Sequence, residues 1–356
     1  MNIQKKKLTM WSTSATLFAA VALITAGCTG TGAVAPPTST TAVTAKPAAS
    51  IYCGSACQAQ LQLKAAPASV KCNVGVSWSA TSFPYGAVSS KQIPDLASKW
   101  FPGMKVTVTD GQGDSAVQSG QVDQMVAQGI KVLIISPRDS DALKGAVDRA
   151  VAAGVKVIAA DRNVNTKVDT YIGSDNVEAG VVSGKNIAKV LGSSGKLVEL
   201  AGSLGASPTI ARGDGLRTGL KDSTVKIVSS QAADYDQAKG LTVMQDLLQK
   251  YPTGTINGVY THNDQMAFGA IQAIKEAGRA AEIKVFSIDG EDKALSDIQD
   301  GSMQGTVGYP LVTKESVIAA AMLCSGEPIE GRIKLDSTLI DASNAKDFVG
   351  KSPQTE

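Results

Sequence analysis

The sequence has few of the residues that catalysis, metal binding and nucleic-acid binding usually require. It contains one histidine, His262, which argues against a His-rich metal site and against His-dependent acid–base chemistry. Aromatic residues form only 4% of the chain, whereas glycine occurs 35 times, a profile that favours alternating strands and tight turns over an aromatic-rich β-sandwich. Hydrophobic residues form 43% of the chain, enough for a packed core, and the length of 356 residues predicts two domains or one large one.

The chain also lacks an excess of charge of either sign. The formal net charge is +2, from 34 Lys and Arg against 32 Asp and Glu. Lys5, Lys6 and Lys7 lie in a segment that we expect to be removed, which leaves 31 basic residues against 32 acidic ones and a net charge of −1. A chain so close to neutrality offers no basic surface for nucleic acid or for an anionic membrane.

The N-terminus is typical of an export signal rather than of a permanent membrane helix. In residues 1–27, three lysines precede an apolar stretch that four hydroxyl residues between positions 12 and 16 interrupt. The stretch ends in Thr25-Ala26-Gly27-Cys28, which resembles the lipobox of bacterial lipoproteins and implies that Cys28 becomes the acylated first residue. Thr25 stands where a large aliphatic residue is usual, so a plain secretory signal with an incidental cysteine is the alternative.

The segment after Cys28 predicts a flexible, lipid-anchored tether over residues 28–71. Residues 29–50 are rich in Thr, Ala, Pro, Ser and Gly and contain no aliphatic residue larger than valine, so they bury too little surface to offset their ordering entropy. Four further cysteines allow two disulfides, and all three pairings remain open. A Cys-x-x-x-Cys spacing without a nearby His is poor for zinc, so we predict structural disulfides, no metal and no cofactor. These cysteines are Cys53, Cys57, Cys72 and Cys324.

From residue 72 onward, short β-branched runs alternate with helical patterns. Helical spacing is clearest at Val122 with Met125, at Leu241 with Met244, and over residues 264–277, where Asp264 is the candidate N-cap. Apolar strands that alternate with helices predict an α/β fold with parallel sheets covered on both faces. About four strands precede residue 171 and four more precede residue 290, which predicts two doubly wound, Rossmann-like lobes. The expected strands are 74–77, 106–109, 132–136, 157–161, 197–200, 225–229, 259–261 and 285–288.

Polar residues gather where these strands end, and ligands of such sheets bind beyond the carboxyl ends of the strands. Carboxylate, guanidinium and amide groups suit a polyhydroxylated ligand, because adjacent hydroxyls offer paired donors and acceptors, and aromatic rings can cover the faces of a sugar. A single Asp at a strand end is more often a helix cap, but Asp161-Arg162, Asn263 and Asp289 together favour a shared site.

From about residue 71 to residue 341, the chain resembles the periplasmic sugar-binding proteins of the ribose-binding type, which are solute receptors of bacterial ABC importers. The stretch 259–278 is especially similar to galactofuranose-binding members. The matching stretches are collinear: 135–142 (ISPRDSDA), 161–163 (DRN), 174–176 (SDN), 205–207 (GAS) continuing to Arg212-Gly213, 233–236 (ADYD), 239–241 (KGL), 262–267 (HNDQMA) and 287–290 (SIDG).

The resemblance implies a type I binding-protein fold whose two lobes close on one monosaccharide, a pentose or a hexose, furanose forms included. The N-terminal lobe would contain residues 72–173 plus 310–335, and the C-terminal lobe residues 174–309 plus 336–350. The chain would cross between the lobes three times, near residues 173–174, 309–310 and 335–336.

Matched position by position, the resemblance also implies the ligand site. Asp161 and Arg162 would come from the first lobe, and Tyr235 would place its ring against the sugar. Ser136 stands where ribose binders have Asn, and Tyr309 where they have Gln, so both departures argue against ribose itself. The first loop is longer than the ribose pattern. The remaining candidates are Arg212, Asn263 and Asp289 from the second lobe and Ser77, Phe83 and Tyr85 after the first strand.

The sequence therefore predicts an exported, monomeric sugar-binding lipoprotein, without enzymatic activity, that hands its ligand to the permease of an ABC importer. It would be anchored to the outer face of the cell membrane or lie in the periplasm. One alternative is a receptor that presents its ligand to a chemosensor or a sensor kinase. Another is an exported glycosidase that uses Asp161 and Asp289 as its carboxyl pair. We disfavour the glycosidase because Arg162 and Arg212 are expected to keep both acids ionised, which leaves no proton donor.

Overall fold

The computed structural model describes residues 46–329 and 331–355. The predicted signal peptide, Cys28 and the first part of the predicted tether lie outside this range. Among the residues described, none of the helices has both the length and the apolar character needed to cross a membrane.

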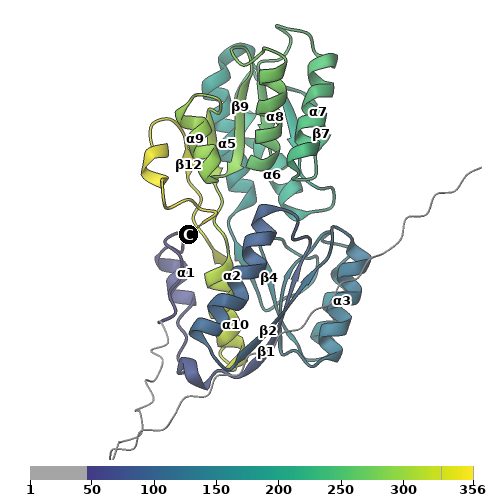
Figure 1. The fold of residues 1–356 in the computed structure, drawn as a ribbon, viewed down its shortest axis with the longest axis vertical. Coiled ribbons are helices and arrows are strands. Elements are labelled where there is room, and N and C mark those ends of the chain that lie inside the picture. The colour runs from purple at the N-terminus through teal and green to yellow at the C-terminus, as the bar shows by residue number, and fades with distance from the viewer. Residues whose placement is uncertain (1–45, 330, 356) are drawn as a thin grey trace, which may run out of the picture. The chain divides into compact units, whose positions relative to one another are not determined.

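Six parallel strands form the sheet of the N-terminal lobe, in the order β11-β5-β4-β3-β1-β2 (Figure 1). The central strand β3 is apolar at four consecutive positions, as expected of a strand that is buried on both faces. The strands are β1 (Cys72–Trp78), β2 (Met104–Asp110), β3 (Val132–Ser136), β4 (Lys156–Ala160), β5 (Thr170–Gly173) and β11 (Ile333–Lys334).

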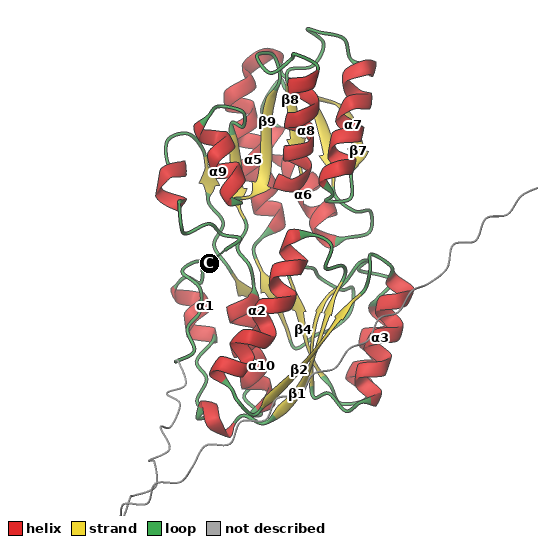
Figure 2. Cartoon of the chain, viewed as in Figure 1, coloured by secondary structure: helices red, strands yellow, loops and turns green. Residues whose placement is uncertain are grey.

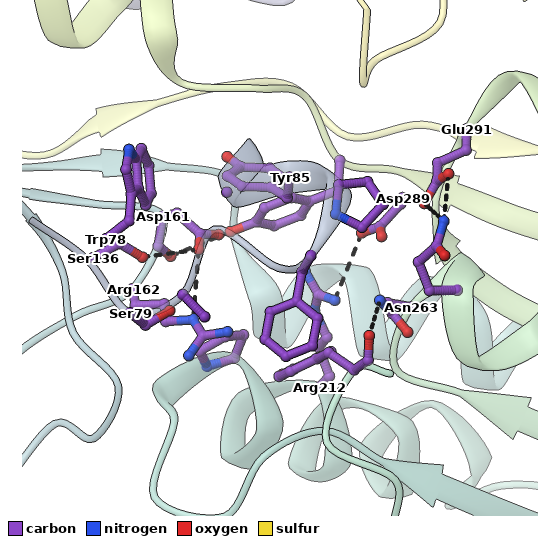
Figure 3. A pocket seen from close by; sticks show the side chains of 18 residues that line it. Trp78, Ser79, Tyr85, Ser136, Asp161, Arg162, Arg212, Asn263, Asp289 and Glu291 are labelled. Atoms are coloured by element: carbon purple, nitrogen blue, oxygen red, sulfur yellow. Dashed lines mark hydrogen bonds and ion pairs between the residues drawn. The ribbon is translucent and has the colours of Figure 1, made fainter. Parts of the chain in front are cut away.

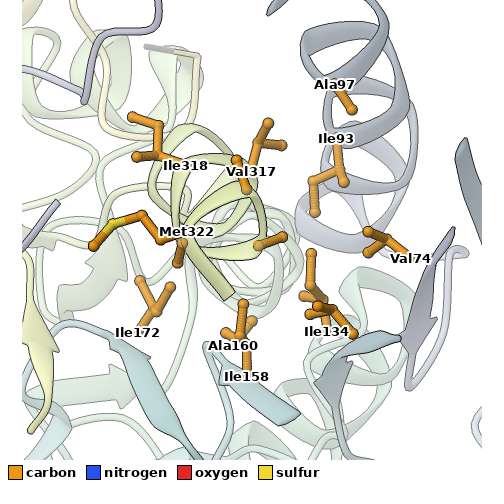
Figure 4. Close-up of a cluster of buried hydrophobic side chains, with 14 of the residues drawn as sticks. Val74, Ile93, Ala97, Ile134, Ile158, Ala160, Ile172, Val317, Ile318 and Met322 are labelled. Carbon is orange, nitrogen blue, oxygen red and sulfur yellow. The ribbon is translucent and has the colours of Figure 1, made fainter. Parts of the chain in front are cut away.

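Alternating side chains of these strands pack against helices on opposite faces. Ile134 and Ile158 face α2 (Pro84–Trp100) and α10 (Thr313–Cys324), in the cluster drawn in Figure 4. Their neighbours Leu133 and Val157 face α3 (Ser115–Ala127) and α4 (Lys144–Ala152). The period of two along each strand thus divides one sheet into two hydrophobic layers.

The sheet of the C-terminal lobe repeats this plan in the order β12-β10-β9-β8-β6-β7, with only β12 antiparallel (Figure 2). Its strands are β6 (Lys196–Ala201), β7 (Lys226–Ala232), β8 (Gly258–Thr261), β9 (Lys284–Asp289), β10 (Gly305–Gly308) and β12 (Leu339–Ile340). Helices α5 (Asn176–Leu191) and α6 (Ser207–Leu220) cover one face. Helices α7 (Gln237–Lys250), α8 (Asp264–Glu276) and α9 (Asp292–Gln299) cover the other.

The predicted fold class is confirmed, with corrections at the ends of elements. All eight predicted strands are present, whereas β5, β10, β11 and β12 were not predicted because they are too short to show a pattern. Asp161 lies just beyond β4, not in it. The prediction of Asp264 as the cap of α8 is wrong: Asn263 caps the helix, and the Asp264 carboxylate instead accepts hydrogen bonds from the backbone N–H groups of Gly290 and Glu291.

The chain passes between the two sheets three times, after β5, after β10 and after β11, where the resemblance implied the crossings. The second crossing is held by the C-terminal residues: the Gln354 amide donates to the carbonyl oxygen of Tyr309, and the Leu311 N–H donates to that of Pro353. The C-terminal lobe therefore extends to residue 355, beyond the predicted end at 350.

The predicted tether is wrong for residues 46–71, which form an ordered N-terminal strap. The strap contains α1 (Ser55–Gln60) and the short 3-10 helix η1 (Pro67–Ser69), and it contributes Leu61 and Val70 to the core of the N-terminal lobe. The Ser50 N–H donates to the carboxylate of Glu315 (2.7 Å), and the Tyr52 carbonyl accepts from Asp336 at the third crossing (2.9 Å). Contacts with distant residues order this segment, so its own composition did not reveal the strap.

One disulfide lies within the strap and a second lies within the N-terminal lobe. Cys53 pairs with Cys57 within the strap, and Cys72 at the start of β1 pairs with Cys324 at the end of α10. The structure thus selects one of the three pairings that the sequence left open.

The two disulfides are expected to differ in their effect on stability. The Cys72–Cys324 bond closes a loop of 252 residues and the Cys53–Cys57 bond a loop of 4. Loop-closure entropy therefore predicts a loss of about 5 kcal/mol for the pair Cys72→Ala and Cys324→Ala, against about 2 kcal/mol for Cys53→Ala and Cys57→Ala. Urea unfolding of the two double variants measures the difference. Equal losses would contradict it.

Candidate functional site

A cavity of about 60 Å³ lies where the two sheets face each other, and side chains from both lobes line it (Figure 3). Ten of the eleven predicted ligand residues line this cavity: Phe83, Tyr85, Ser136, Asp161, Arg162, Arg212, Tyr235, Asn263, Asp289 and Tyr309. The strand-end rule brings them together, because the carboxyl ends of both parallel sheets point at the cavity.

Ser77 is the exception, and its prediction is wrong. Its hydroxyl accepts a hydrogen bond from the Gln118 amide (3.2 Å), on the face of β1 that is turned towards α3, and Ser77 does not line the cavity. The next residue, Trp78, lines the cavity instead. Successive side chains of a strand point to opposite faces, so an error of one residue along β1 was enough to select Ser77 instead of Trp78.

Asp161 and Arg162 form the polar wall of the N-terminal lobe. The Arg162 Nε lies 3.7 Å from the Asp161 Oδ2, which also accepts a hydrogen bond from the Ser136 hydroxyl (3.3 Å). Both residues are more than nine-tenths buried. Arg162 Nε itself has no hydrogen-bond partner among the residues described, and neither does the indole N–H of Trp78. Buried N–H groups of this kind are expected to be satisfied by a ligand.

Arg212 holds the opposite wall, in the C-terminal lobe. Its guanidinium donates to the Asn176 side chain (2.8 Å) and to the His262 carbonyl, and lies 3.8 Å from the Asp289 carboxylate. It also lies over the ring of Tyr309, 4.5 Å from the ring centre. The planar guanidinium can hold these partners in fixed directions, which a lysine could not do.

Aromatic rings enclose the space between the two walls. Tyr309 comes from the second crossing and Tyr85 from α2, and their ring centres lie 6.2 Å apart. Tyr235, from the C-terminal lobe, lies under the Arg162 guanidinium at 5.4 Å, so this cation–π contact joins the lobes. The arrangement pairs charged groups with apolar ring faces, as a polyhydroxylated ring requires.

Backbone strain is concentrated at this cavity. Among the residues that the structure describes, five non-glycine residues have positive φ angles, and three of them, Asp161 (66°), Tyr235 (63°) and Asp289 (138°), line it. Each such conformation costs about 1–3 kcal/mol and is typical of functional sites. This strain indicates that tertiary packing, and not the backbone preference of each residue, determines where these three side chains point.

The role of Asn263 is partly structural. Its side-chain oxygen accepts from the Met266 N–H and its amide donates to the Tyr235 carbonyl, so one N–H is left to face the cavity. Besides Trp78, seven lining residues were not predicted: Ser79, Ala80, Pro84, Gly86, Pro208, Gln265 and Glu291. Glu291 stands at the N-cap position of α9, and its carboxylate accepts a hydrogen bond from the Gln265 amide at 2.8 Å. Glu291 lies two residues after Asp289, the last residue of β9, so the strand-end rule extended by two residues would have predicted it.

Comparison with known proteins agrees with this geometry. The family model of the periplasmic binding protein domain matches residues 74–327. The chain belongs to this family. The resemblance seen in the sequence is therefore confirmed, and the two lobes are those of a type I periplasmic binding protein.

Three relatives illustrate the range of the family. The ribose import binding protein of Bacillus subtilis is 36% identical over 263 residues, which cover 73% of this chain and 84% of that protein. The crystal structure of a galactofuranose-binding protein has 29% identity and a TM-score of 0.74, covering 79% and 98% of the two chains. The fructose-binding periplasmic domain of a hybrid two-component system has 27% identity and a TM-score of 0.73, covering 78% and 93%.

Contrary to expectation, Arg162 and Arg212 do not hold the pKa values of this carboxyl pair below their usual range. Burial raises the pKa of Asp161 despite the charges of Arg162 and Arg212. Burial also raises the pKa of Asp289 well above its usual range, because the nearby carboxylates of Asp264 and Glu291 add to the effect and outweigh Arg212. The pKa of Glu291 rises to about 7 for the same two reasons, burial and the charge of Asp264. Desolvation exceeds ion pairing at this site.

His262 does not line the cavity and takes part in a buried network. Its Nδ1 accepts from the Gly202 N–H, so Nε2 carries the proton and donates to Glu199 (3.0 Å). Arg217 pairs with the same carboxylate (2.8 Å). Burial alone would raise the pKa of Glu199, but the hydrogen bonds from His262 and Arg217 bring it down to about 2. No cluster of metal-ligating residues occurs in the part of the chain that the structure describes.

The Glu199 network is expected to make stability dependent on pH. A carboxyl pKa lowered from 4.5 to about 2 contributes stability above pH 4.5, which is lost as the pH falls towards 2. The difference corresponds to about 3 kcal/mol. Burial also lowers the pKa of His262. Stability is therefore lost here too as the pH falls below the usual histidine value of 6.5. Urea unfolding of Glu199→Gln should show a large loss at pH 7 and a much smaller one at pH 3. A loss independent of pH would contradict the assignment.

Proposed function

We propose that the chain is an exported sugar receptor that encloses one monosaccharide between its lobes and delivers it to the permease of an ABC importer. The observation that carries the proposal is the cavity itself, where each lobe contributes an arginine beside a carboxyl and tyrosine rings lie between them. A ligand that contacts both walls stabilises the closed arrangement of the lobes over an open one.

The relatives support a sugar as the ligand. Those of known specificity described above bind ribose, galactofuranose or fructose by name. Ser136 and Tyr309, which replace the residues of ribose binders, argue for a sugar other than ribose. The family resemblance supports export, and the Cys28 motif supports a lipid anchor on the outer face of the membrane. A monomer is sufficient, because one chain supplies both walls.

Hydrolysis is the less favoured chemistry because the named relatives are binding proteins. The ionisation argument no longer supports this exclusion, since burial raises the pKa of both Asp161 and Asp289. The exclusion therefore needs a direct measurement: incubation with aryl glycosides should release no product.

Thermal unfolding of the chain from residue 29 onward, against a panel of pentoses, hexoses, furanose forms and polyols, tests the proposal. The fragment must retain the strap, because residues 46–71 pack into the N-terminal lobe. A ligand at one hundred times its dissociation constant stabilises by about 2.7 kcal/mol, enough to raise the midpoint by several degrees. A response to one sugar supports the receptor. A flat response across the panel contradicts it.

A sensory role is the second candidate, favoured by the likeness to a periplasmic domain of a two-component system. Uptake of the labelled sugar by cells that lack this chain separates the two. Loss of uptake supports import, whereas normal uptake with a lost transcriptional response supports sensing.

A further inference from the structure

Two loops from opposite lobes meet outside the sugar cavity. Residues 137–143 follow β3 in the N-terminal lobe, and residues 202–206 follow β6 in the C-terminal lobe. Three hydrogen bonds cross between the lobes here: Ser140 N–H to the Gly205 carbonyl (3.1 Å), Arg138 to the Leu204 carbonyl (3.3 Å), and Asn163 N–H to the Ser207 hydroxyl (2.8 Å). None of these six residues lines the cavity.

Gly205 is the tightest point of this contact. A methyl group built on its Cα would overlap the Oδ2 of Asp139 and lie 2.7 Å from the Cγ of the same residue. Its φ of +79° is also one that side chains rarely adopt. Asp139 cannot easily move aside, because its other carboxylate oxygen accepts from the N–H groups of Asp141 (2.9 Å) and Ala142 (2.8 Å).

The clash is specific to the closed arrangement, since Gly205 and Asp139 belong to different lobes. Within its own lobe, the Arg138 N–H is held by Gln118 (2.8 Å) and the Arg138 Nε by the Gly113 carbonyl (3.0 Å), so the N-terminal side of the contact is rigid. A side chain at position 205 would therefore keep the lobes apart without changing any group that faces the cavity.

We infer that Gly205, opposite Asp139, is a closure-determining residue: it sets the affinity of the receptor through the closed population of the lobes and makes no contact with the ligand. Apparent affinity is the intrinsic affinity multiplied by the fraction of molecules able to close. A residue that lowers this fraction weakens the binding of every ligand by the same factor. A residue that touches the ligand discriminates between ligands.

The first experiment needs no ligand. Hydrogen–deuterium exchange of the chain from residue 29 onward should be faster in Gly205→Ala than in the unsubstituted chain at the amides of Ser140 and Asn163, whose acceptors lie across the interface. The amide of Arg138, bonded within its own lobe, is the internal reference and should not change. Equal exchange at Ser140 and Asn163 in the two proteins would overturn the inference.

The second experiment measures affinity, and only this arm rests on the proposed sugar-receptor function. Using the panel sugars that stabilise the unsubstituted chain, Gly205→Ala should weaken each by the same factor, at least tenfold. Gly254→Ala is the matched control, because Gly254 has a similar φ (+82°) and open space around its Cα. It should leave affinity unchanged. A Gly205→Ala affinity within twofold of the unsubstituted chain would overturn the inference.

A double-variant cycle isolates the clash from backbone strain. In an Asp139→Ala background the obstructing carboxylate is gone, so Gly205→Ala should cost much less affinity than it does with Asp139 present. Equal costs in both backgrounds would show that strain at position 205 is responsible, and would overturn the role of the Asp139 contact. A panel without any binding sugar would refute the proposed function, and the exchange experiment would still decide the inference.

Discussion

Replacing Arg212 by alanine is expected to abolish sugar binding and to destabilise the fold at the same time. The guanidinium joins α6 to the Asn176 side chain, the His262 carbonyl, Asp289 and the ring of Tyr309. Truncating one partner of a buried charged pair costs about 3–5 kcal/mol, because the other partner is left without compensation. Burial already raises the pKa of Asp289, so its carboxyl group can take up a proton when Arg212 is absent. The loss of unfolding free energy should therefore lie near the lower end of this range. Affinity should fall by at least about 100-fold.

The measurement is urea unfolding together with calorimetric titration of the sugar that the panel identifies. Arg149→Ala is the matched control, since Arg149 makes an exposed ion pair with Asp123 (2.8 Å) far from the cavity and should change neither quantity by a measurable amount. Arg212→Lys should recover part of the stability but little affinity, because an ammonium group cannot reproduce the planar contacts. An Arg212→Ala protein that still binds with normal affinity would remove Arg212 from the site.

Substitution of Asp161 is expected to weaken sugar binding strongly with little effect on the fold. Asparagine keeps the shape of the side chain and tolerates the positive φ of 66°, so Asp161→Asn isolates the contribution of charge. A hydrogen bond to a charged group contributes about 1.5–3 kcal/mol, which corresponds to a loss of affinity of roughly 10- to 150-fold. Asp161→Ala, and Arg162→Ala on the other half of the pair, should reduce binding below detection.

Titration calorimetry and thermal unfolding of each variant test this expectation. Asp123→Asn, at the exposed ion pair with Arg149, is the control for removing a carboxylate elsewhere on the same lobe. Unchanged affinity in both Asp161→Ala and Arg162→Ala would refute the assignment of the cavity. Loss of binding accompanied by cooperative unfolding at a much lower temperature would instead indicate that the pair mainly supports the fold.

Much of the site followed from local pattern alone. The strands that end at Ser136, Ala160, Thr261 and Asp289 show their apolar runs in the sequence, and polar residues stand at or just after their ends. Parallel strands bring these ends to one edge, so Asp161, Arg162, Asn263 and Asp289 could be placed together before any distance was known. The closing of two such edges on each other came from the family resemblance.

The features that escaped prediction all depend on partners far away in the chain. Residues 46–50 share the tether composition of residues 29–50, and the prediction extended it to residue 71, yet contacts with Glu315 and Asp336 order residues 46–71 into a strap. Trp78 lines the cavity and Ser77 does not, because the packing of β1 against α2, α3 and α10 decides which face each side chain occupies. Asn263 serves as a cap because Asp264 is drawn to the N–H groups of residues 290 and 291.

The sequence by itself determined the α/β architecture and the two lobes, since periodicity and strand ends are local properties. Together with the family resemblance, it also gave ten of the eighteen residues that line the cavity. Only the tertiary structure decided the disulfide pairing, the raised pKa values of the buried carboxyls and the opposition of Gly205 to Asp139. The Cys72–Cys324 bond and the opposition of Gly205 to Asp139 depend on distances between residues far apart in the chain. The raised pKa values depend on the water that burial removes. None of these three features is a property of a short segment.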